Sequence, residues 1–346
     1  MNGKRKLFWA LFSLLLAVLS IWAVIGQSKN LSLAQMLASV RNANPFWLFF
    51  ALLCTALYVI MEGEALRCIL RGIGYHLSFR RGLLCSTADI YFSAITPSAT
   101  GGQPASAYFM VKSGVPAGVA TATLLVNLIL YTVSLITLGL AAVVAHFRLF
   151  LGMRLISKLL IGVGFVILLV LTVLFFAMLR RGALIFGALR RFVRFLHRKK
   201  LIFRLEYRLE RLNNMEADFG NCAKTMKGKG PTMLRAFLWN LGQRAAQIAV
   251  PTFLFLALGG RPHLALPLFA SQCLVTLGYN CVPVPGAMGV ADFLMLDAFS
   301  GLMAMEEAFR LEILSRGLSF YICVAISGII TGIGYLLLKK RKGIDS

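Results

Sequence analysis

The chain has 346 residues, of which 59% are hydrophobic and only 14% are charged, and its mean hydropathy is +0.79. This composition excludes an ordinary water-soluble fold, which does not carry so much apolar sequence. The net charge of +23 raises nucleic-acid binding as an alternative, but basic clusters placed between long apolar runs are typical of a membrane protein.

Apolar runs long enough to span a bilayer recur along the chain. Each has about the 20 residues that a helix needs to cross roughly 30 Å of hydrocarbon. The runs are residues 7–25, 46–66, 118–145, 158–179, 232–258 and 317–338. The first follows Lys4, Arg5 and Lys6, as a signal peptide would, but it is long and no small-residue cleavage site follows Val24. We therefore interpret it as an uncleaved anchor.

Basic residues gather in four stretches beside these runs. The stretches are residues 4–6, 67–81, 180–229 and 339–342. The positive-inside rule assigns them to the cytoplasmic side, so both termini are predicted to lie inside a multi-pass protein of the cell membrane. Because this topology accounts for the charge, no nucleic-acid partner is expected. Within 180–231 a rough stripe of leucines indicates either a helix on the anionic inner leaflet or a plain cytoplasmic helix pair.

An interruption, "ITPSATGGQPASAY" at residues 95–108, breaks the apolar sequence after the second run. The predicted topology requires residues 83–113 to begin and end on the cytoplasmic side. As a helix the arm 83–96 would be only about 21 Å long, which is short for a span. We therefore expect a re-entrant hairpin, although two short spans satisfy the same topology.

A second interruption, "YNCVPVPGAMGVAD" at residues 279–292, lies within residues 264–302, which must begin and end outside. Pro285 and Gly289 have the same spacing as Pro97 and Gly101. Two broken hairpins that enter from opposite faces are typical of an inverted repeat. The expected fold is an all-α polytopic membrane protein with about six full spans plus two re-entrant or broken hairpins. It forms one domain, with a first half at 46–179, a basic cytoplasmic segment at 180–231 and a second half at 232–338.

The interruptions are the predicted binding site. Irregular backbone in a membrane is tolerated only inside protein or beside water, and helices that restart after a break direct positive N-terminal ends into the cavity. A phosphate or carboxylate suits such a place. The predicted substrate-binding residues are Pro97, Ser98, Thr100, Gly101, Gly102, Gln103 and Pro104 in the first break, and Pro283, Pro285, Gly286, Gly289 and Asp292 in the second. The alternative is that the prolines only kink ordinary helices.

Polar residues also form one stripe of the fifth run, at Asn240, Gln243, Arg244 and Gln247. Arg244 and Gln247 are added to the predicted site, because a buried arginine can hold a lipid phosphate through two hydrogen bonds. The alternative is an internal ion pair with one of the aspartates Asp89, Asp292 and Asp297. Near the end of the second run, Glu64 and Arg67 are expected to pair locally, while Glu62 is a weaker functional candidate.

Signals for catalysis are poor. The four histidines are scattered, the seven cysteines stand singly without a C-x-x-C pair, and no Walker loop, dinucleotide fingerprint or G-x-S-x-G motif is present. No metal or other cofactor is expected, and transport would have to run downhill or on an ion gradient.

Three segments carry a family resemblance: "TPSATGGQPASAYFMVKSG" at 96–114, "VPVPGAMGVAD" at 282–292 and "SRGLSFY" at 315–321. They resemble the lysylphosphatidylglycerol synthase transmembrane family, the flippase-like membrane region of multiple peptide resistance factor proteins. The resemblance covers nearly the whole chain. It implies movement of aminoacylated phosphatidylglycerol to the outer leaflet, which counters cationic antimicrobial peptides, and it adds Arg316 to the predicted site.

The chain departs from the family pattern at four positions. Gln103 and Asp292 stand where the family often has glutamate, and Asn127 and Leu128 stand where an acidic–basic pair is common. These changes lower the charge in the expected cavity, so the identity of the lipid stays open.

Two functions are therefore weighed. The first is translocation of a phospholipid, with membrane phospholipids as partners. The second is phosphatidylglycerol lysyltransferase activity, alone or with a separate lipid-modifying enzyme. Full-length relatives attach a soluble transferase domain, whereas this chain ends at Ser346, so no enzymatic activity is expected in isolation. A homo-oligomer and a scaffold for cell-envelope enzymes are further alternatives.

Overall fold

Every regular element among the described residues is a helix, and these residues contain no strand, which confirms the predicted all-α class. The computed structural model describes residues 41–96, 99–198, 205–280, 282, 287 and 289–342. The predicted anchor at 7–25 and the residues Pro97, Ser98, Pro283, Pro285 and Gly286 therefore lie outside the described part.

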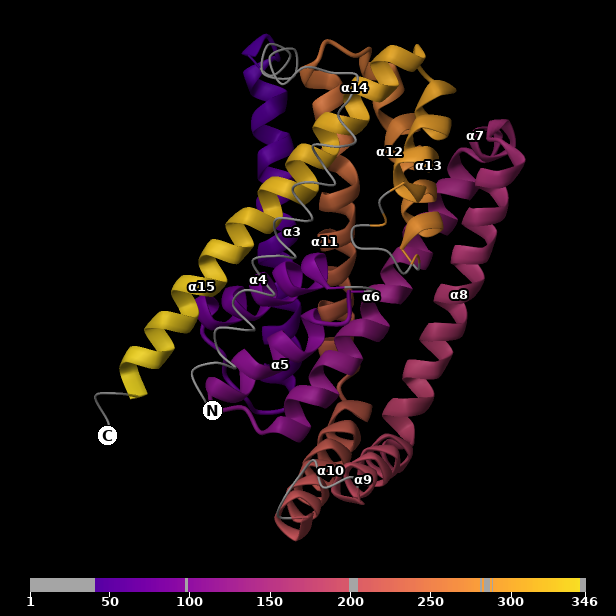
Figure 1. Cartoon of the computed structure of the whole chain (residues 1–346). Coiled ribbons are helices and arrows are strands. Elements are labelled where there is room, and N and C mark those ends of the chain that lie inside the picture. Colours follow the sequence, from indigo (N-terminus) through magenta and orange to yellow (C-terminus); the bar gives the residue numbers. More distant parts are fainter. Residues whose placement is uncertain are drawn as a thin grey trace.

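Figure 1 shows the order of the elements, whose labels are kept here. The helices of the first half are α3 (Pro45–Gly72), α4 (Phe79–Ile95), α5 (Gly102–Lys112), α6 (Ala117–Ala145), α7 (Phe147–Gly152) and α8 (Leu155–Arg180). The basic segment contains α9 (Gly182–Arg198) and α10 (Leu205–Lys227). The second half contains α11 (Gly230–Ala257), η2 (Pro262–Leu264), α12 (Ala265–Tyr279), α13 (Val290–Ser300), α14 (Met305–Arg316), η4 (Gly317–Ile322) and α15 (Cys323–Lys342).

Four helical runs are long and apolar enough to cross a membrane: Pro45–Gly72, Ala117–Ala145, Leu155–Arg180 and Met305–Leu338. They match four of the predicted spans. The predicted span 232–258 is one continuous helix, α11, which packs along α3 (Figure 1). This helix is not among the four apolar runs because it contains polar residues, including Arg235 and Arg244, that lower its mean hydropathy.

The last span begins earlier than predicted. The sequence predicts this span at 317–338, but the helix already begins at Met305 and continues through the π-helical η4 into α15. The apolar pattern does not reveal this start, because charged residues interrupt it in α14. Arg310 pairs with Glu306 at 3.2 Å and Arg316 with Glu312 at 3.4 Å, one turn apart in each case, so these charges are compatible with a helix.

Each predicted interruption separates two short helices. The α4 and α5 helices pack against each other and have 17 and 11 residues, and α12 and α13 do the same with 15 and 11 residues. The first pair lies in the lower half of the bundle in Figure 1 and the second in the upper half. Ala99 in the first break and Ala287 in the second have positive φ angles of 54° and 49°, and no other non-glycine residue of the described part does. Both breaks therefore contain a backbone conformation that side chains disfavour.

The buried core is divided into two hydrophobic clusters. Along α3, Ala51 and Cys54 belong to one cluster and Leu66 to the other. Along α11, Ala246 belongs to the first and Ala236 to the second. Glu62 of α3 and Asn240, Gln243 and Arg244 of α11, which are all buried, lie between these two levels. The fold therefore places a polar layer at the middle of an otherwise apolar bundle.

Candidate functional site: a polar cavity between the two breaks

A cavity of about 590 Å³ occupies this polar layer. Its walls come from α3, α4, α5, α6, α8, α11, α12, α13, α14 and η4, and Ala99 and Ala287 line it at the two breaks. Its polar lining consists of Tyr58, Glu62, Asp89, Ser93, Gln103, Asn127, Tyr131, Thr132, Gln243, Arg244, Gln247, Gln272, Thr276, Tyr279, Asn280, Ser315, Arg316 and Ser319. Such a cavity can hold a small polar group away from lipid.

Arg244 is the buried cation on the α11 wall, with 5% of its surface exposed. Its Nη1 donates to Gln247 Oε1 at 2.7 Å, and its guanidinium carbon lies 4.3 Å from the ring centre of Tyr131 and 5.0 Å from that of Tyr58. Its Nε has no hydrogen-bond partner among the described residues. Two aromatic faces and an amide thus hold the guanidinium in place without neutralising its charge.

The carboxyl groups of Glu62 on α3 and Asp89 on α4 meet beside this arginine and hydrogen-bond to each other. Gln243 Nε2 donates to Glu62 Oε2 at 3.1 Å, and Gln103 Nε2 lies 3.4 Å from Asp89 Oδ1. Ser86 Oγ is 3.5 Å from Glu62 Oε2 and donates more closely to the Val59 carbonyl, at 2.6 Å. Four helices therefore contribute to one network.

The glycine pair of the first break is explained by close packing on Asp89. A Cβ added at Gly102 would lie 2.3 Å from Asp89 Oδ1 and 2.0 Å from Ser93 Oγ. A Cβ at Gly101 would lie 2.7 Å from Thr96 Cγ2, and the Gly101 N–H donates to Thr96 Oγ1 at 2.9 Å. Only glycine lets the start of α5 approach α4 this closely.

A second charged group lies at the other break. Arg316 Nε is 2.5 Å from Asp292 Oδ1 and 3.4 Å from Glu312 Oε1. The second oxygen of Asp292, Oδ2, accepts from the Gly289 N–H at 2.8 Å and so caps the start of α13. Arg316 lines the cavity from α14, but two carboxylates surround it.

Two further hydrogen bonds connect the halves of the chain across the cavity level. Tyr131 on α6 donates to Asn280 at the end of α12 at 2.5 Å. Asn240 on α11 donates to Asn127 on α6 at 2.9 Å. The cavity walls are therefore tied together by neutral groups as well as by charges.

The predicted site residues fall into three groups. Those that line the cavity are Gln103, Arg244, Gln247 and Arg316. Those that build the two breaks beside it are Thr100, Gly101, Gly102, Pro104, Gly289 and Asp292. The prolines Pro97, Pro283 and Pro285, together with Ser98 and Gly286, lie outside the described residues, so their contribution stays a prediction.

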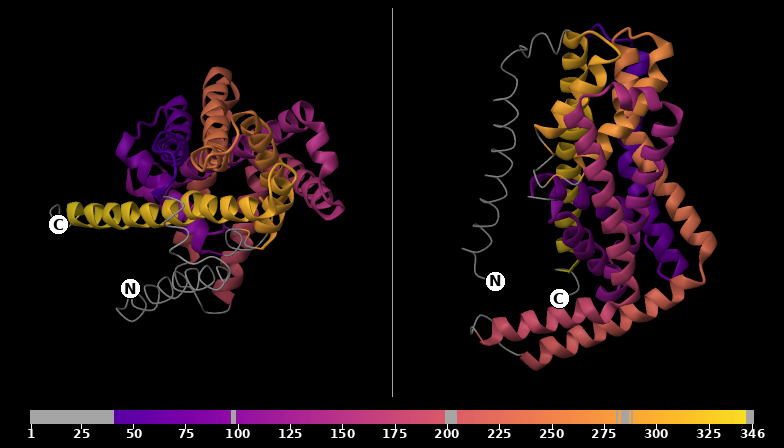
Figure 2. Two further views of the ribbon diagram at one scale, coloured as in Figure 1. Left: turned by 90° about the horizontal axis from the view of Figure 1, so that it is seen from above. Right: turned by 90° about the vertical axis from the view of Figure 1, so that its right-hand side faces the viewer.

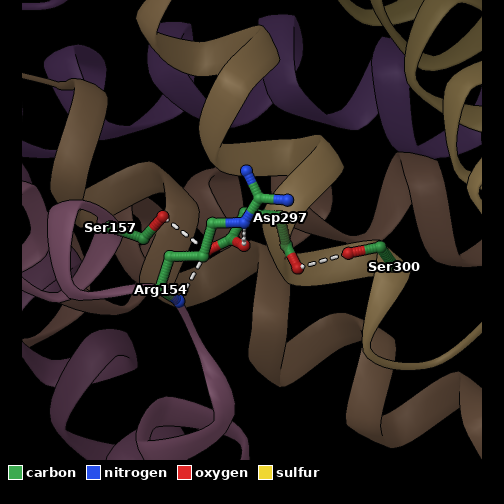
Figure 3. A network of polar contacts seen from close by, with 4 residues as sticks. All are labelled: Arg154, Ser157, Asp297 and Ser300. Carbon is green, nitrogen blue, oxygen red and sulfur yellow. Dashed lines mark hydrogen bonds and ion pairs between the residues drawn. The ribbon is translucent and has the colours of Figure 1, made fainter.

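Among the described residues, no salt bridge joins Arg244 to Asp89, Asp292 or Asp297, the three candidates for the alternative ion pair, although Asp89 lies beside Arg244 and hydrogen-bonds to Glu62. In the described part of the chain Asp292 pairs with Arg316, and Asp297 pairs with Arg154, at 3.3 Å between Nε and Oδ1 (Figure 3). Asp297 Oδ2 also accepts from Ser157 Oγ at 2.5 Å and from the Arg154 N–H at 3.0 Å, which joins the start of α8 to α13. The local pair of Arg67 and Glu64, in contrast, is confirmed.

Several cavity residues were missed by sequence reasoning. On α12, Gln272, Thr276 and Asn280 recur at intervals of four, which is the signature of one helix face, and all three line the cavity. Tyr58, which was also missed, stands at the same interval before Glu62, the weaker candidate on α3, and both line the cavity. Scanning every apolar run for polar residues at helical spacing would have found these positions.

These observations define the class of the protein: an all-helical, membrane-spanning protein with a polar cavity between two helical interruptions. The sequence profile described as "Lysylphosphatidylglycerol synthase TM region" matches residues 10–327. The chain therefore belongs to this family, as its motifs predicted. No functionally curated protein matches the chain.

Proposed function

We propose that this protein translocates phospholipid between the leaflets of the cell membrane, with the headgroup in the polar cavity and the acyl chains in the surrounding lipid. The observation that carries the proposal is Arg244. This buried cation faces a cavity of about 590 Å³ and has no carboxylate ion pair among the described residues. A buried charge without such a pair is costly and marks a functional site in a membrane protein.

The proposed substrate is phosphatidylglycerol or its aminoacylated form. The phosphate can accept charge-assisted hydrogen bonds from the Arg244 guanidinium, and the amides of Gln103, Gln243 and Gln247 can hydrogen-bond to glycerol or aminoacyl oxygens. The family description, which names lysylphosphatidylglycerol, supports this choice.

The two broken hairpins support a route through the protein. The arms α5 and α13, with 11 residues each, are about 17 Å long at 1.5 Å per residue, shorter than a bilayer core. If the hairpins re-enter from opposite faces, each break meets the headgroup at the middle of the membrane.

The test uses the purified full chain in liposomes that contain tail-labelled phosphatidylglycerol. Dithionite quenches only outer-leaflet label, so the expected result is a quenched fraction that rises from about half to nearly all of the label. Arg244→Ala should slow this movement, and Arg154→Ala, which alters an arginine outside the cavity, should not. Unassisted transfer of lysine from charged tRNA to phosphatidylglycerol, without lipid movement, would instead establish the synthase alternative.

A further inference from the structure

The hydrogen-bonded carboxyl pair of Glu62 and Asp89 has a consequence for charge in the cavity. Two carboxylates cannot both stay ionised within hydrogen-bonding distance in a buried site, so they share a proton. A hydrogen bond between two carboxyl groups itself requires that proton, because an ionised carboxylate only accepts.

The surroundings provide a single positive charge for this pair. The titratable groups that face it are Tyr58 on α3, Cys85 on α4, Arg244 on α11 and Cys323 on α15. Phenols and thiols are neutral at physiological pH. Within the described chain Arg244 is therefore the counter-charge of the pair.

Unpartnered polar atoms point to a ligand at the same place. Gln243 is 1% exposed, its Nε2 donates to Glu62, and its Oε1 has no hydrogen-bond partner among the described residues. Arg244 Nε is in the same situation. Buried polar atoms almost always have a hydrogen-bond partner. We therefore infer that Gln243 Oε1 and Arg244 Nε bind a group that enters the cavity.

The net charge of Arg244 and the carboxyl pair can be counted with and without a bound headgroup. With one shared proton the carboxyl pair carries one negative charge, which offsets Arg244 and leaves the empty cavity neutral. An entering phosphodiester adds a negative charge, and burying it without compensation would cost several kcal/mol. A second proton on the pair restores neutrality.

We propose that Glu62 and Asp89 form a proton-binding site that takes up one proton with each anionic headgroup, so that phospholipid movement is coupled to a proton gradient. This coupling rests on the proposed transport function. The first of the two tests below therefore measures the proton site without measuring transport. Neither glutamine nor asparagine can hold the shared proton, whereas both keep the size of the side chain.

The first test is infrared absorption of the purified full chain at neutral pH. The expected result is a protonated-carboxyl stretch that shifts in D₂O and disappears in both Glu62→Gln and Asp89→Asn, while signals from other carboxyl groups persist. Glu306→Gln, at an exposed glutamate of α14, is the matched control and should keep the band. A spectrum in which neither variant removes a protonated-carboxyl band would overturn the proton site, whatever the protein transports.

The second test follows labelled phosphatidylglycerol in liposomes with a pH gradient and an enclosed pH indicator. Movement toward the alkaline side should be accelerated by up to about tenfold per pH unit, the limit for one proton, and should acidify that side. The Glu62→Gln, Asp89→Asn double variant should lose this dependence, and Glu306→Gln should keep it. Lipid movement that ignores the gradient would overturn the coupling and leave the transport function intact, whereas no movement under any condition would overturn the transport function.

A separate observation concerns α9, which lies with α10 across the lower end of the bundle in Figure 2. One side of α9 is fixed to α10, since Phe186 packs on Phe219 with ring centres 5.6 Å apart and Arg190 pairs with Glu216 at 2.5 Å. The large side chains Leu184, Phe192 and Phe195 are more than half exposed, at 62%, 57% and 53%.

Three further arginines of α9 are exposed beside this apolar surface: Arg191, Arg194 and Arg198. On a helical wheel they lie between the apolar side and the side that faces α10. An apolar helix surface flanked by arginines is complementary to the headgroup region of an anionic bilayer. We infer that α9 lies in the interface of the membrane and collects anionic phospholipid there.

An environment-sensitive label at Phe192→Cys in the full chain in nanodiscs tests this. The α10 cysteine will not compete, because burial raises the pKa of the Cys222 thiol to about 12. Emission should shift to the blue in phosphatidylglycerol nanodiscs relative to phosphatidylcholine, and the shift should shrink at high salt and in Arg191→Gln, Arg194→Gln. A control label at Tyr207→Cys, on exposed α10, should not respond. A Phe192 label that reports water in both lipids would overturn the assignment.

Discussion

The cavity contains two buried arginines with opposite surroundings. Arg316 lies between two carboxylates, Asp292 at 2.5 Å and Glu312 at 3.4 Å. Arg244 is held by one amide and two aromatic rings and forms no ion pair with a described carboxylate. The Arg316 salt bridges join α13 to α14, whereas Arg244 forms no salt bridge within the described residues, so its guanidinium can donate to the anionic headgroup of the proposed transport function.

The largest expected effect follows from removing Arg316. In Arg316→Ala the carboxyl groups of Asp292 and Glu312, which hydrogen-bond to each other, lose their common counter-charge, which costs about 3–5 kcal/mol. We expect a much lower thermal transition in detergent, measured by fluorescence-detected size exclusion. In Arg316→Met, with Asp292→Asn and Glu312→Gln added, all three charges are gone and much of the stability should return. A triple variant as unstable as the single one would contradict the ion-pair explanation.

Removing Arg244 should have a large effect on transport and a smaller effect on folding than removing Arg316, because no salt bridge between described residues is lost. Loss of a charge-assisted hydrogen bond to phosphate is worth about 1.5–3 kcal/mol, or roughly ten- to a hundredfold in rate. Arg244→Ala should therefore slow phosphatidylglycerol movement by this factor in the dithionite assay.

Arg244→Lys is the informative control, because it keeps the charge and loses the planar fork that donates two hydrogen bonds. We expect intermediate transport and a thermal transition close to that of the parent chain. Equal transport in the parent chain and Arg244→Ala would remove the contrast between the two arginines.

Much of this arrangement can be predicted from the sequence. The apolar runs predict the long helices because backbone groups in hydrocarbon must be satisfied internally, and the Pro–Gly breaks mark the hairpins because neither residue suits a helix interior. Arg244 is identified by its polar stripe on α11. The partners of each charge cannot be predicted in this way, since Glu62 meets Asp89, and Asp297 meets Arg154, only through tertiary packing.

The start of the last helix shows the same limit. The uninterrupted apolar run begins at Gly317, but the helix begins at Met305, and the charges in its first turns pair with one another along α14. An apolar run therefore marks the part of a helix that can cross a membrane, and it does not mark where the helix begins.

A smaller effect is expected at Gly102, where α5 packs closely against Asp89, beside Arg244. In Gly102→Ala the new methyl would meet Asp89 and Ser93 at 2.3 and 2.0 Å, and overpacking of this kind costs about 1–3 kcal/mol. Because α5 must shift away from α4, transport should fall together with the thermal transition. Gly162→Ala, in α8, meets nothing within 4 Å and is the matched control. It should leave both quantities unchanged or slightly raise stability, and parallel losses in both variants would show that the effect is not local.

The smallest effect is expected at Arg154, whose exposed side chain forms an ion pair with Asp297. Its side chain is 67% exposed, so Arg154→Ala should lower stability by no more than about 1 kcal/mol. Asp297 is only 7% exposed and keeps its bonds from Ser157 Oγ and the backbone N–H of residue 154, so its charge stays satisfied. Asp297→Ala removes all of these bonds and should cost more than Arg154→Ala in the same thermal assay. Across the arginines Arg316, Arg244 and Arg154, we expect the loss of stability on substitution to depend on whether a buried carboxyl group loses its salt-bridge partner. Equal losses of stability in Arg154→Ala and Arg316→Ala would contradict that dependence.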